Sequence, residues 1–325
     1  MADFPSISVF IPVRNEAAKI RACLDGILSQ TVPVTEILVV DSGSTDGTLE
    51  ILREYPMVKI VEIPGAEFNH GETRNLGLVH ATGEFLLYTV GDARPTDNHW
   101  LERMLQPMLD DSDIMAVCGQ QVVAHDPANN PVEWFRPVSI GKLRTVQIAS
   151  PAAYQALPPD EKRALCHWDD VTVIYRRMAL EANPFQRTLY CEDAIWARDA
   201  LLKGWKLGVH PGAQVYHHHF EDADFTFKRA ITVGYHRYMI FGTIPSRPTW
   251  LRSSLRAIAT ILRHTPGMPL AMKYRWIAHN WHNQRALAKA VDLFETTRKQ
   301  GDVALEALHQ KIAGRPPIPV KSPLV

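Results

Sequence analysis

Hydrophobic residues between positions 7 and 90 recur with two alternating periods. Short β-branched runs predict strands, and between them apolar side chains fall three or four positions apart, as in an amphipathic helix. Residues 20, 24, 27 and 28 form one such helical face, and Asn15 is placed to cap that helix. The predicted strands are residues 7–11, 36–40, 58–63 and 85–90, and the later predicted helices are residues 48–55 and 73–81.

Strands separated by helices in this rhythm predict right-handed βαβ units and a largely parallel sheet that is covered on both faces. Such sheets bind ligands beyond the carboxyl ends of their strands. Polar, loop-forming residues follow three of the predicted strands, at positions 12–16, 41–46 and 91–92. We therefore expect these three segments to meet in one cleft.

The pattern changes in the rest of the chain. Residues 125–170 lose their periodicity and are typical of a long loop with some helix. Residues 171–175, 206–209 and 213–216 then predict strands, and residues 192–203 predict a helix that ends at Gly204. Beyond residue 225 the pattern is helical to about residue 312, with breaks near residues 245–248 and 266–269. The Pro-rich tail from Arg315 is predicted to be loose.

Charge is unevenly distributed along the 325 residues although the formal net charge is zero. Residues 1–224 carry 31 Asp and Glu against 19 Lys and Arg, whereas residues 225–325 carry 4 against 16. The four cysteines show no CxxC spacing, which favours reduced thiols over a disulfide framework or a zinc ribbon. No basic leader precedes the first apolar run and no apolar run reaches the length of a membrane span, so we expect a cytoplasmic protein.

Two aspartates follow predicted strands and are candidates for ligand binding. Asp41 opens the polar run 41–47, where a carboxylate accepts a hydrogen bond from the imide N–H of a pyrimidine base or from a ribose hydroxyl. The same run is equally typical of a capped turn, since Ser, Gly and Asp all form turns. Asp92 follows the fourth predicted strand, and it is either a ligand for Mg²⁺ or Mn²⁺ or a turn cap.

Three further groups each allow a functional and a purely structural interpretation. Glu192 and Asp193 begin a predicted helix, where they either complement its dipole or include a general base that deprotonates a hydroxyl. His217 and His219 point to the same side if the preceding strand continues, and they form either part of a Mn²⁺ site or a surface cluster. Arg74, in the first turn of a helix, pairs either with a diphosphate or with an internal carboxylate.

Several common nucleotide and hydrolase motifs are missing from the sequence. It has no GxGxxG after the first predicted strand, no GxxxxGK[ST] and no GxSxG. These absences argue against a dinucleotide-binding domain, a P-loop NTPase and an α/β-hydrolase.

In their order along the chain, these segments resemble the family 2 glycosyltransferases with the GT-A fold, and especially their bacterial rhamnosyltransferase-like branch. The resemblance covers residues 6–224. Residues 11–16 and 40–48 are similar to the family's two nucleotide-binding segments, and residues 68–71 with 73–75 to a segment typical of the branch. Glu192 and Asp193 with Trp196 resemble the acidic catalytic motif, and His217 with His219 the late histidine motif.

The resemblance implies an α/β chain with the GT-A fold, a mostly parallel central sheet and a basic α-helical C-terminal extension. The catalytic domain is then residues 1–224, with a nucleotide-binding half at 1–95 and an acceptor and catalytic half at 96–224. Residues 225–325 form the extension and its loose tail. The irregular stretch before residue 170 is expected to face the acceptor.

The resemblance also implies an inverting mechanism that uses Mn²⁺ or Mg²⁺. Asp193 takes the role of the base, beside Glu192, and the metal is held by Asp92 and His217, with His219 as second choice. The family's Asp-x-Asp falls on residues 90–92, where only the second acid is present, as the branch also tends to have it. The residues implied in nucleotide binding are Pro12, Arg14, Glu16, Asp41, Ser44, Asp46, Arg74 and Gly91.

The function implied is transfer of a sugar, with rhamnose as one candidate, from a dTDP- or UDP-linked donor to a glycan or lipid-linked glycan hydroxyl in bacterial surface polysaccharide synthesis. The alternative is a nucleotide-sugar-binding or scaffold protein without catalysis. Residues 246–312 either contact the inner face of the membrane peripherally or form a helical subdomain that packs on the acidic domain or on a second subunit of a homo-oligomer. Aromatic residues there follow core spacing, so no nucleic-acid binding is expected.

Overall fold

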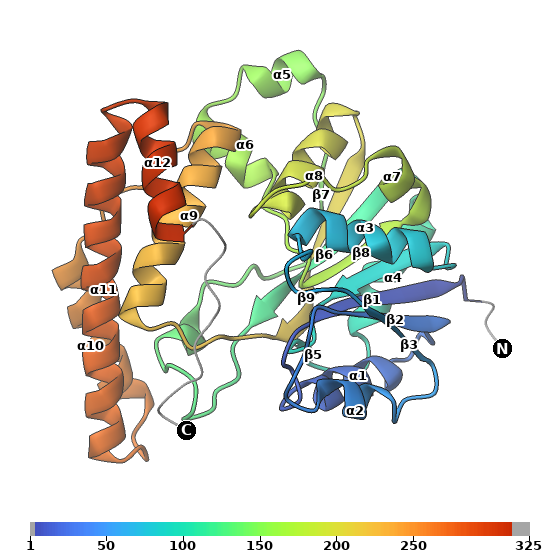
Figure 1. The fold of residues 1–325 in the computed structure, drawn as a ribbon, viewed down its shortest axis with the longest axis horizontal. Helices are drawn as coiled ribbons and strands as arrows, with labels where there is room; N and C mark the ends of the chain where they lie inside the picture. The colour runs from blue at the N-terminus through green and yellow to red at the C-terminus, as the bar shows by residue number, and fades with distance from the viewer. Residues whose placement is uncertain (1–3, 314–325) are drawn as a thin grey trace. The chain divides into compact units, whose positions relative to one another are not determined.

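A computed structural model gives the fold and describes residues 4–313. Strands and helices alternate over the first half, and helices make up the C-terminal part (Figure 1). The strands are β1 (Ile7–Val13), β2 (Glu36–Asp41), β3 (Val58–Glu62), β4 (Phe85–Thr89), β5 (Arg94–Pro95), β6 (Ile114–Val122), β7 (Arg144–Val146), β8 (Thr172–Arg176) and β9 (Lys206–Tyr216). The helices of the same part are α1 (Ile20–Leu28), α2 (Thr48–Leu52), α3 (His70–His80), α4 (Trp100–Asp110), α5 (Pro151–Gln155), α6 (Pro159–Leu165), α7 (Arg177–Ala182) and α8 (Glu192–Leu202).

Within the described residues, nine strands form one sheet in the order β3-β2-β1-β4-β8-β6-β9-β5, with β7 paired to β9. The first half is parallel, as predicted: β1 pairs in parallel with both β2 and β4, and β2 with β3. The second half is mixed, because β8 lies antiparallel between β4 and β6, although β6 and β9 pair in parallel. The expectation of a largely parallel sheet is therefore wrong for this half.

The order of elements explains that difference. A parallel pair needs a crossover that returns the chain to the same end of the sheet. The helix α4 and the strand β6 are not among the elements that the sequence pattern predicts, and β8 enters the sheet after the irregular stretch that follows β6. The two short strands predicted at 206–209 and 213–216 are one strand, β9, whose pairing with β6 shifts register on the way.

The hydrophobic core of the strand-containing part lies between the sheet and the helices that cover it. Figure 1 shows α1 and α2 on one side of strands β1–β3 and α3 on the other. The spacing of apolar residues in α1 predicts most of its buried face: Ile20, Leu24 and Ile27 are buried, together with Cys23, whereas Leu28 is exposed. Asn15, however, does not cap α1, whose N-cap residue Lys19 makes no side-chain cap hydrogen bond.

Helices of the C-terminal part pack around apolar clusters of their own. They are α9 (Ala223–Phe241), α10 (Trp250–His264), α11 (Leu270–Arg298) and α12 (Asp302–Ala313), and they begin and end close to the predicted breaks. Ile231, Phe294 and Leu305 meet in one cluster, and Ile261, Met268 and Trp276 in another. The predicted loose tail from Arg315 lies outside the described residues.

The chain divides into two compact units, and each unit is made of three separate segments of the sequence. The first unit is residues 1–122, 138–188 and 192–217, and the second is residues 123–137, 189–191 and 218–325. Residues 123–137 join the second unit through specific bonds. Asn130 and Asn280 exchange side-chain hydrogen bonds, and the Trp276 indole donates to the carbonyl oxygen of Pro127.

No helix among residues 4–313 combines the length and the apolar character that crossing a membrane requires.

Candidate active site

Two loops at the carboxyl ends of β1 and β2 are held together by hydrogen bonds. Asn15 adopts a left-handed backbone conformation with φ of 59°, which Asn tolerates better than most residues. Its Oδ1 accepts from the backbone N–H of Thr45, and its own N–H donates to Ser44 Oγ, both at 2.8 Å. The N–H of Ala17 donates to Asp46. Asn15, Ser44 and Asp46 thus brace the two loops against each other.

Asp41, the last residue of β2, is buried with one oxygen satisfied by the protein. Its Oδ2 accepts from the N–H groups of Gly43 and Ser44, both at 2.9 Å. Its Oδ1 is buried and has no hydrogen-bond partner. A buried acceptor without a donor costs about 1–3 kcal/mol, so such groups in a native fold usually have a ligand or water as partner. This oxygen can accept an N–H or O–H of a bound ligand.

The loop after β4 carries Gly91 and Asp92 against the first loop. A Cβ on Gly91 would lie 2.8 Å from Val13 Cγ1 and 3.2 Å from Glu16 Cγ, so only glycine fits there. Burial, and after it the nearby Asp92 carboxylate, raises the pKa of Glu16 to about 7. The ammonium of Lys19 lies 3.1 Å from Asp92 Oδ2. Glu16 and Asp92 thus lie near each other, beside the ammonium group of Lys19.

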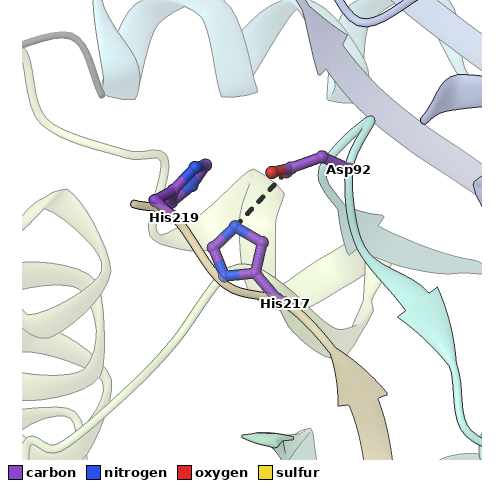
Figure 2. A group of neighbouring side chains, drawn as sticks. All are labelled: Asp92, His217 and His219. Carbon is purple, nitrogen blue, oxygen red and sulfur yellow. Dashed lines mark ion pairs between the residues drawn. The ribbon is translucent and has the colours of Figure 1, made fainter. Parts of the chain in front are cut away.

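Asp92, His217 and His219 form the group in the described residues that could hold a metal ion (Figure 2). Each offers one ligand atom, and these atoms lie within 4.8 Å of one another. His217 Nε2 lies 3.3 Å from Asp92 Oδ1. His217 directly follows β9, and its N–H donates to the carbonyl oxygen of Val122, which continues the strand pairing by one residue. His219 comes two residues later on the same segment.

Hydrogen bonds behind His217 determine which of its ring nitrogens carries the proton. The Gln121 amide donates through Nε2 to the Asp169 carboxylate, which accepts only. Gln121 Oε1 must then accept from His217 Nδ1, 2.7 Å away. Nε2 of a neutral His217 consequently presents its lone pair to Asp92. Two lone pairs at this distance repel each other unless a proton or a metal ion lies between them.

This donor set fits a divalent metal ion. Metal-ligating imidazoles usually donate their second N–H to an oxygen that fixes the ring, as Gln121 does here. A mixture of carboxylate and imidazole ligands suits Mn²⁺ better than Mg²⁺, which prefers oxygen ligands. Asp92, His217 and His219 would hold the ion, and the remaining positions would stay open to phosphate oxygens.

A second cluster of charges surrounds the start of α8. Arg74, which is buried, lies with Nε 2.5 Å from Asp170 Oδ2 and Nη1 2.6 Å from Glu192 Oε1. The Tyr175 hydroxyl donates to the other oxygen of Asp170. Two buried acids, Asp170 and Glu192, thus share one buried guanidinium, and the half-buried Asp193 directly follows Glu192.

The excess of acids shifts the proton equilibria of this cluster. Burial raises the pKa of Asp193 well above its ordinary value, and the carboxylates of Glu192 and Asp170 raise it further. Burial likewise raises the pKa of Asp170, to about 6, against the lowering effect of Arg74. Cys191, immediately before the pair, has a φ of 64°, a strained conformation for this residue type that is common beside functional groups. Asp193 therefore binds a proton more tightly than an ordinary aspartate does.

The family model described as Glycosyl transferase family 2 matches residues 8–177, which is more than half of the chain. The chain belongs to glycosyl transferase family 2. This confirms the resemblance read from the motifs.

Curated members of the family support the same branch. The O-antigen chain rhamnosyltransferase WbaN of Salmonella anatum is 27% identical over 234 residues, which is 71% of this chain and 71% of WbaN. The corresponding RfbN of Salmonella typhimurium is 27% identical over 233 residues, 70% of this chain and 71% of RfbN. Glycosyltransferase AglE of Haloferax volcanii is 42% identical over 104 residues, but that match spans 30% of this chain and only 34% of AglE.

Solved structures confirm the expected GT-A fold. The first 349 residues of TarS from S. aureus align with a TM-score of 0.51 at 18% identity, covering 94% of this chain and 90% of that one. At this level of identity the likeness concerns the fold alone.

The structure separates the predicted family 2 site residues by their surroundings. Asp41 ends β2 and Asp92 follows β4, the two strands that flank β1, and Asp193 lies with Glu192 at the start of α8. Arg74 forms the internal ion pairs that were its alternative interpretation, so the structure gives no support to a contact with the diphosphate. Pro12, at the end of β1, and Arg14, which is exposed in the loop after it, keep their predicted roles as predictions.

The sequence patterns predict no role for four residues of the site. They are Lys19, Gln121, Asp169 and Asp170. Adjacent aspartates directly before a strand are a signal that the sequence does contain, and they connect the two clusters: Asp169 bonds to Gln121 behind His217, and Asp170 to Arg74 beside Glu192. Gln121 has no local signal, because its role depends on the pairing of β6 with β9.

Proposed function

We propose that this chain is an inverting glycosyltransferase that moves a sugar from a dTDP- or UDP-linked donor to a hydroxyl of a glycan or lipid-linked glycan in bacterial surface polysaccharide synthesis. Rhamnose is the sugar we favour, because two of the curated relatives are named O-antigen chain rhamnosyltransferases. The observation that carries the proposal is the Asp92–His217 pair, in which a carboxylate and an oriented imidazole face each other at 3.3 Å beside His219.

The donor nucleoside is assigned to the loops after β1 and β2. The unpartnered Oδ1 of Asp41 accepts the imide N–H of thymine or uracil, a donor that both bases carry. Arg14 is exposed in the loop after β1 and lies close to Gly65. Its Cζ atom is 3.6 Å from the position that a Cβ on Gly65 would occupy. Because Ser44 and Asp46 are bonded to the loop backbone, they hold the shape of the nucleoside site and leave recognition to Asp41.

The donor diphosphate is assigned to the metal ligands Asp92, His217 and His219. When bound, a divalent ion stabilises the negative charge that develops on the departing diphosphate. Gln121 holds His217 with Nε2 toward that position, so the ring need not reorient when the charge develops. Lys19 neutralises Asp92 while no donor is bound, and its long exposed side chain is free to move aside.

Asp193 is assigned the role of the base that accepts the proton of the acceptor hydroxyl as that oxygen attacks the anomeric carbon. Its raised pKa makes it a stronger proton acceptor than an ordinary aspartate, once it is ionised. Glu192 is committed to Arg74, so we assign it a positioning role: the ion pair fixes the start of α8 and thereby the direction of Asp193.

Nucleotide binding tests the proposal directly. Calorimetry and thermal unfolding with dTDP, UDP and GDP, each with Mn²⁺, Mg²⁺ or a chelator, should show binding of a pyrimidine nucleotide that Mn²⁺ strengthens more than Mg²⁺. In Asp41→Asn an amide N–H₂ group can replace the orphan acceptor, and we expect a loss of about 10- to 100-fold in nucleotide affinity.

The same samples separate an enzyme from a binding protein without catalysis. A glycosyltransferase should slowly release free sugar from its cognate donor when Mn²⁺ is present and the acceptor is absent. Nucleotide binding with no release and no transfer to any glycan would favour the non-catalytic alternative. Absence of binding by every nucleotide, in a protein that unfolds cooperatively, would contradict the donor site itself.

A further inference from the structure

The helix α10 presents an apolar stripe to solvent on the second unit. Leu251, Leu255 and Leu262 follow one another at intervals of four and seven positions, which places them on one face. Their side chains are 50%, 56% and 55% exposed. The face of α10 that packs inward is a different one, formed by the buried residues Ser254, Ala257 and Ile261. The leucines are therefore not part of the core of this unit.

A row of arginines runs beside that stripe. Arg252, Arg256 and Arg263 each follow one of the three leucines directly, so they repeat the same spacing on the adjoining face. All three are exposed, and none forms an ion pair with another residue of the described part of the chain. The sequence around them offers no acid, since no Asp or Glu occurs between residues 225 and 291.

The same combination continues into the start of α11. Leu270 and Tyr274 are 81% and 72% exposed, and Lys273 and Arg275 lie beside Tyr274 in the sequence. Figure 1 shows α10 running alongside α11 within this unit. We call the following residues the α10 surface, of which all but the half-buried Lys273 are exposed: Leu251, Arg252, Leu255, Arg256, Leu262, Arg263, Leu270, Lys273, Tyr274 and Arg275.

We propose that the α10 surface docks on an anionic lipid bilayer. Anionic headgroups pair with the arginines, while the leucines and Tyr274 enter the boundary between headgroups and acyl chains, which removes their apolar area from water. A nucleic acid would use the arginines but would leave the leucines in water, and a predominantly polar protein partner would do the same. This inference is independent of the donor site, because none of its residues lies in the first unit.

Vesicle co-sedimentation of the full chain tests the proposal. The wild type should bind vesicles of phosphatidylglycerol and phosphatidylcholine and should bind pure phosphatidylcholine weakly. The triple variant Arg252→Gln, Arg256→Gln, Arg263→Gln should lower the partition coefficient roughly 100-fold, because each cation near an anionic surface contributes about fivefold. The pair Leu255→Gln, Leu262→Gln should also lower it, by at least about tenfold, because burial of each leucine is lost.

Matched control variants keep the result specific. Val303→Gln with Lys299→Gln changes an exposed apolar residue and an exposed cation at α12 and the end of α11, and should leave vesicle binding unchanged. Nucleotide affinity and the unfolding temperature, measured on every variant, separate a folding defect from a docking defect.

Two outcomes would overturn the proposal. Binding that depends on the arginines but is indifferent to Leu255→Gln, Leu262→Gln would show electrostatic adsorption without insertion. A dimer in light scattering that dissociates on the leucine substitutions, with no vesicle binding in the wild type, would show that a second copy of the chain covers this surface.

Discussion

The proton affinity of Asp193 depends strongly on its surroundings. Its carboxyl group is buried beside two other acids, which favours its protonated form. We expect Asp193→Asn to reduce the transfer rate at least about 100-fold, since a general base usually contributes that much, while nucleotide affinity stays unchanged. Steady-state transfer and calorimetry measure the two quantities. Asp199→Asn, on the same helix, is the control and should retain most of its activity.

Gln121 acts on the metal site through His217. In Gln121→Leu the imidazole loses the acceptor that fixes its Nδ1–H, so we expect Mn²⁺ affinity to fall about 10- to 100-fold. Calorimetric titration with Mn²⁺ measures this, and nitrogen NMR of the His217 ring reports the tautomer without any turnover. Gln120→Leu changes the neighbouring strand residue, whose amide bonds elsewhere, and an equal loss in that variant would contradict the positioning role.

Arg74 compensates two buried acids, Asp170 and Glu192, so its removal should destabilise the fold strongly. We expect Arg74→Met to lower the free energy of unfolding by about 3–5 kcal/mol, as when one partner of a buried ion pair is lost. Urea denaturation measures the change. Part of it should return in the double variant with Glu192→Gln, which removes one of the uncompensated charges.

The effect of Arg74→Met should also depend on pH. The pKa of Asp170 is raised from 3.8 to about 6 in the folded protein. A carboxyl group with a raised pKa stabilises the fold fully at low pH and loses that contribution as the pH rises through its folded value. Arg74 lowers the pKa of Asp170, so the loss of Arg74 costs stability only where this carboxyl group is ionised. The difference in the free energy of unfolding between wild type and Arg74→Met should thus be smaller at pH 5 than at pH 8. A difference that grows on acidification would contradict this assignment.

At the scale of elements, residues 68–71 and 73–75, which resemble a segment of the rhamnosyltransferase-like branch, form the start of α3 and its cap. Asn69 caps the helix by accepting from the N–H groups of Gly71 and Glu72, and its amide donates to the carbonyl oxygen of Thr188. A Cβ on Gly71 would lie 2.0 Å from the carbonyl oxygen of Gln186. The backbone of α3 thus packs directly on the segment that leads to Glu192.

Gly71→Ala tests this close approach. The added methyl group must push α3 away from Gln186, so we expect a loss of about 1–3 kcal/mol in the free energy of unfolding, together with reduced activity. Gly267→Ala is a suitable control, because a Cβ there meets nothing within 4 Å. Thermal unfolding of the two variants under the same conditions compares them, and equal stability would show that the helix can shift freely.

At the scale of the whole molecule, the interleaved units restrict where the chain can be divided. Residues 123–137 belong to the second unit, and Asn130 loses its partner Asn280 if the chain ends at residue 224. We expect a fragment of residues 1–224 to unfold at a lower temperature than the full chain and to expose apolar surface. Calorimetry and a fluorescent probe of apolar surface measure this. A fragment as stable as the full chain would show that the first unit is stable without contacts between residues 123–137 and the C-terminal helices.

The sequence alone predicts the first half of the sheet because each strand and helix there has a clear period. Parallel pairing of β1, β2, β3 and β4 follows from the short helical crossovers between them. The same periodicity places Asp41 and Asp92 at the carboxyl ends of strands, and so at one edge of the sheet. The family resemblance adds Glu192, Asp193 and the histidines, whose spacing alone is equally typical of a helix cap and a surface cluster.

What only the tertiary structure decides is which groups meet across long sequence separations. The antiparallel insertion of β8, the ion pairs of Arg74 with Asp170 and Glu192, and the bond from Gln121 to His217 join residues about a hundred positions apart. No local pattern encodes such contacts, because they depend on strand order and register. Local periodicity thus determines the elements and the edge where ligands bind, whereas packing determines which acid is compensated, which is left with a raised pKa, and which imidazole nitrogen faces the metal position.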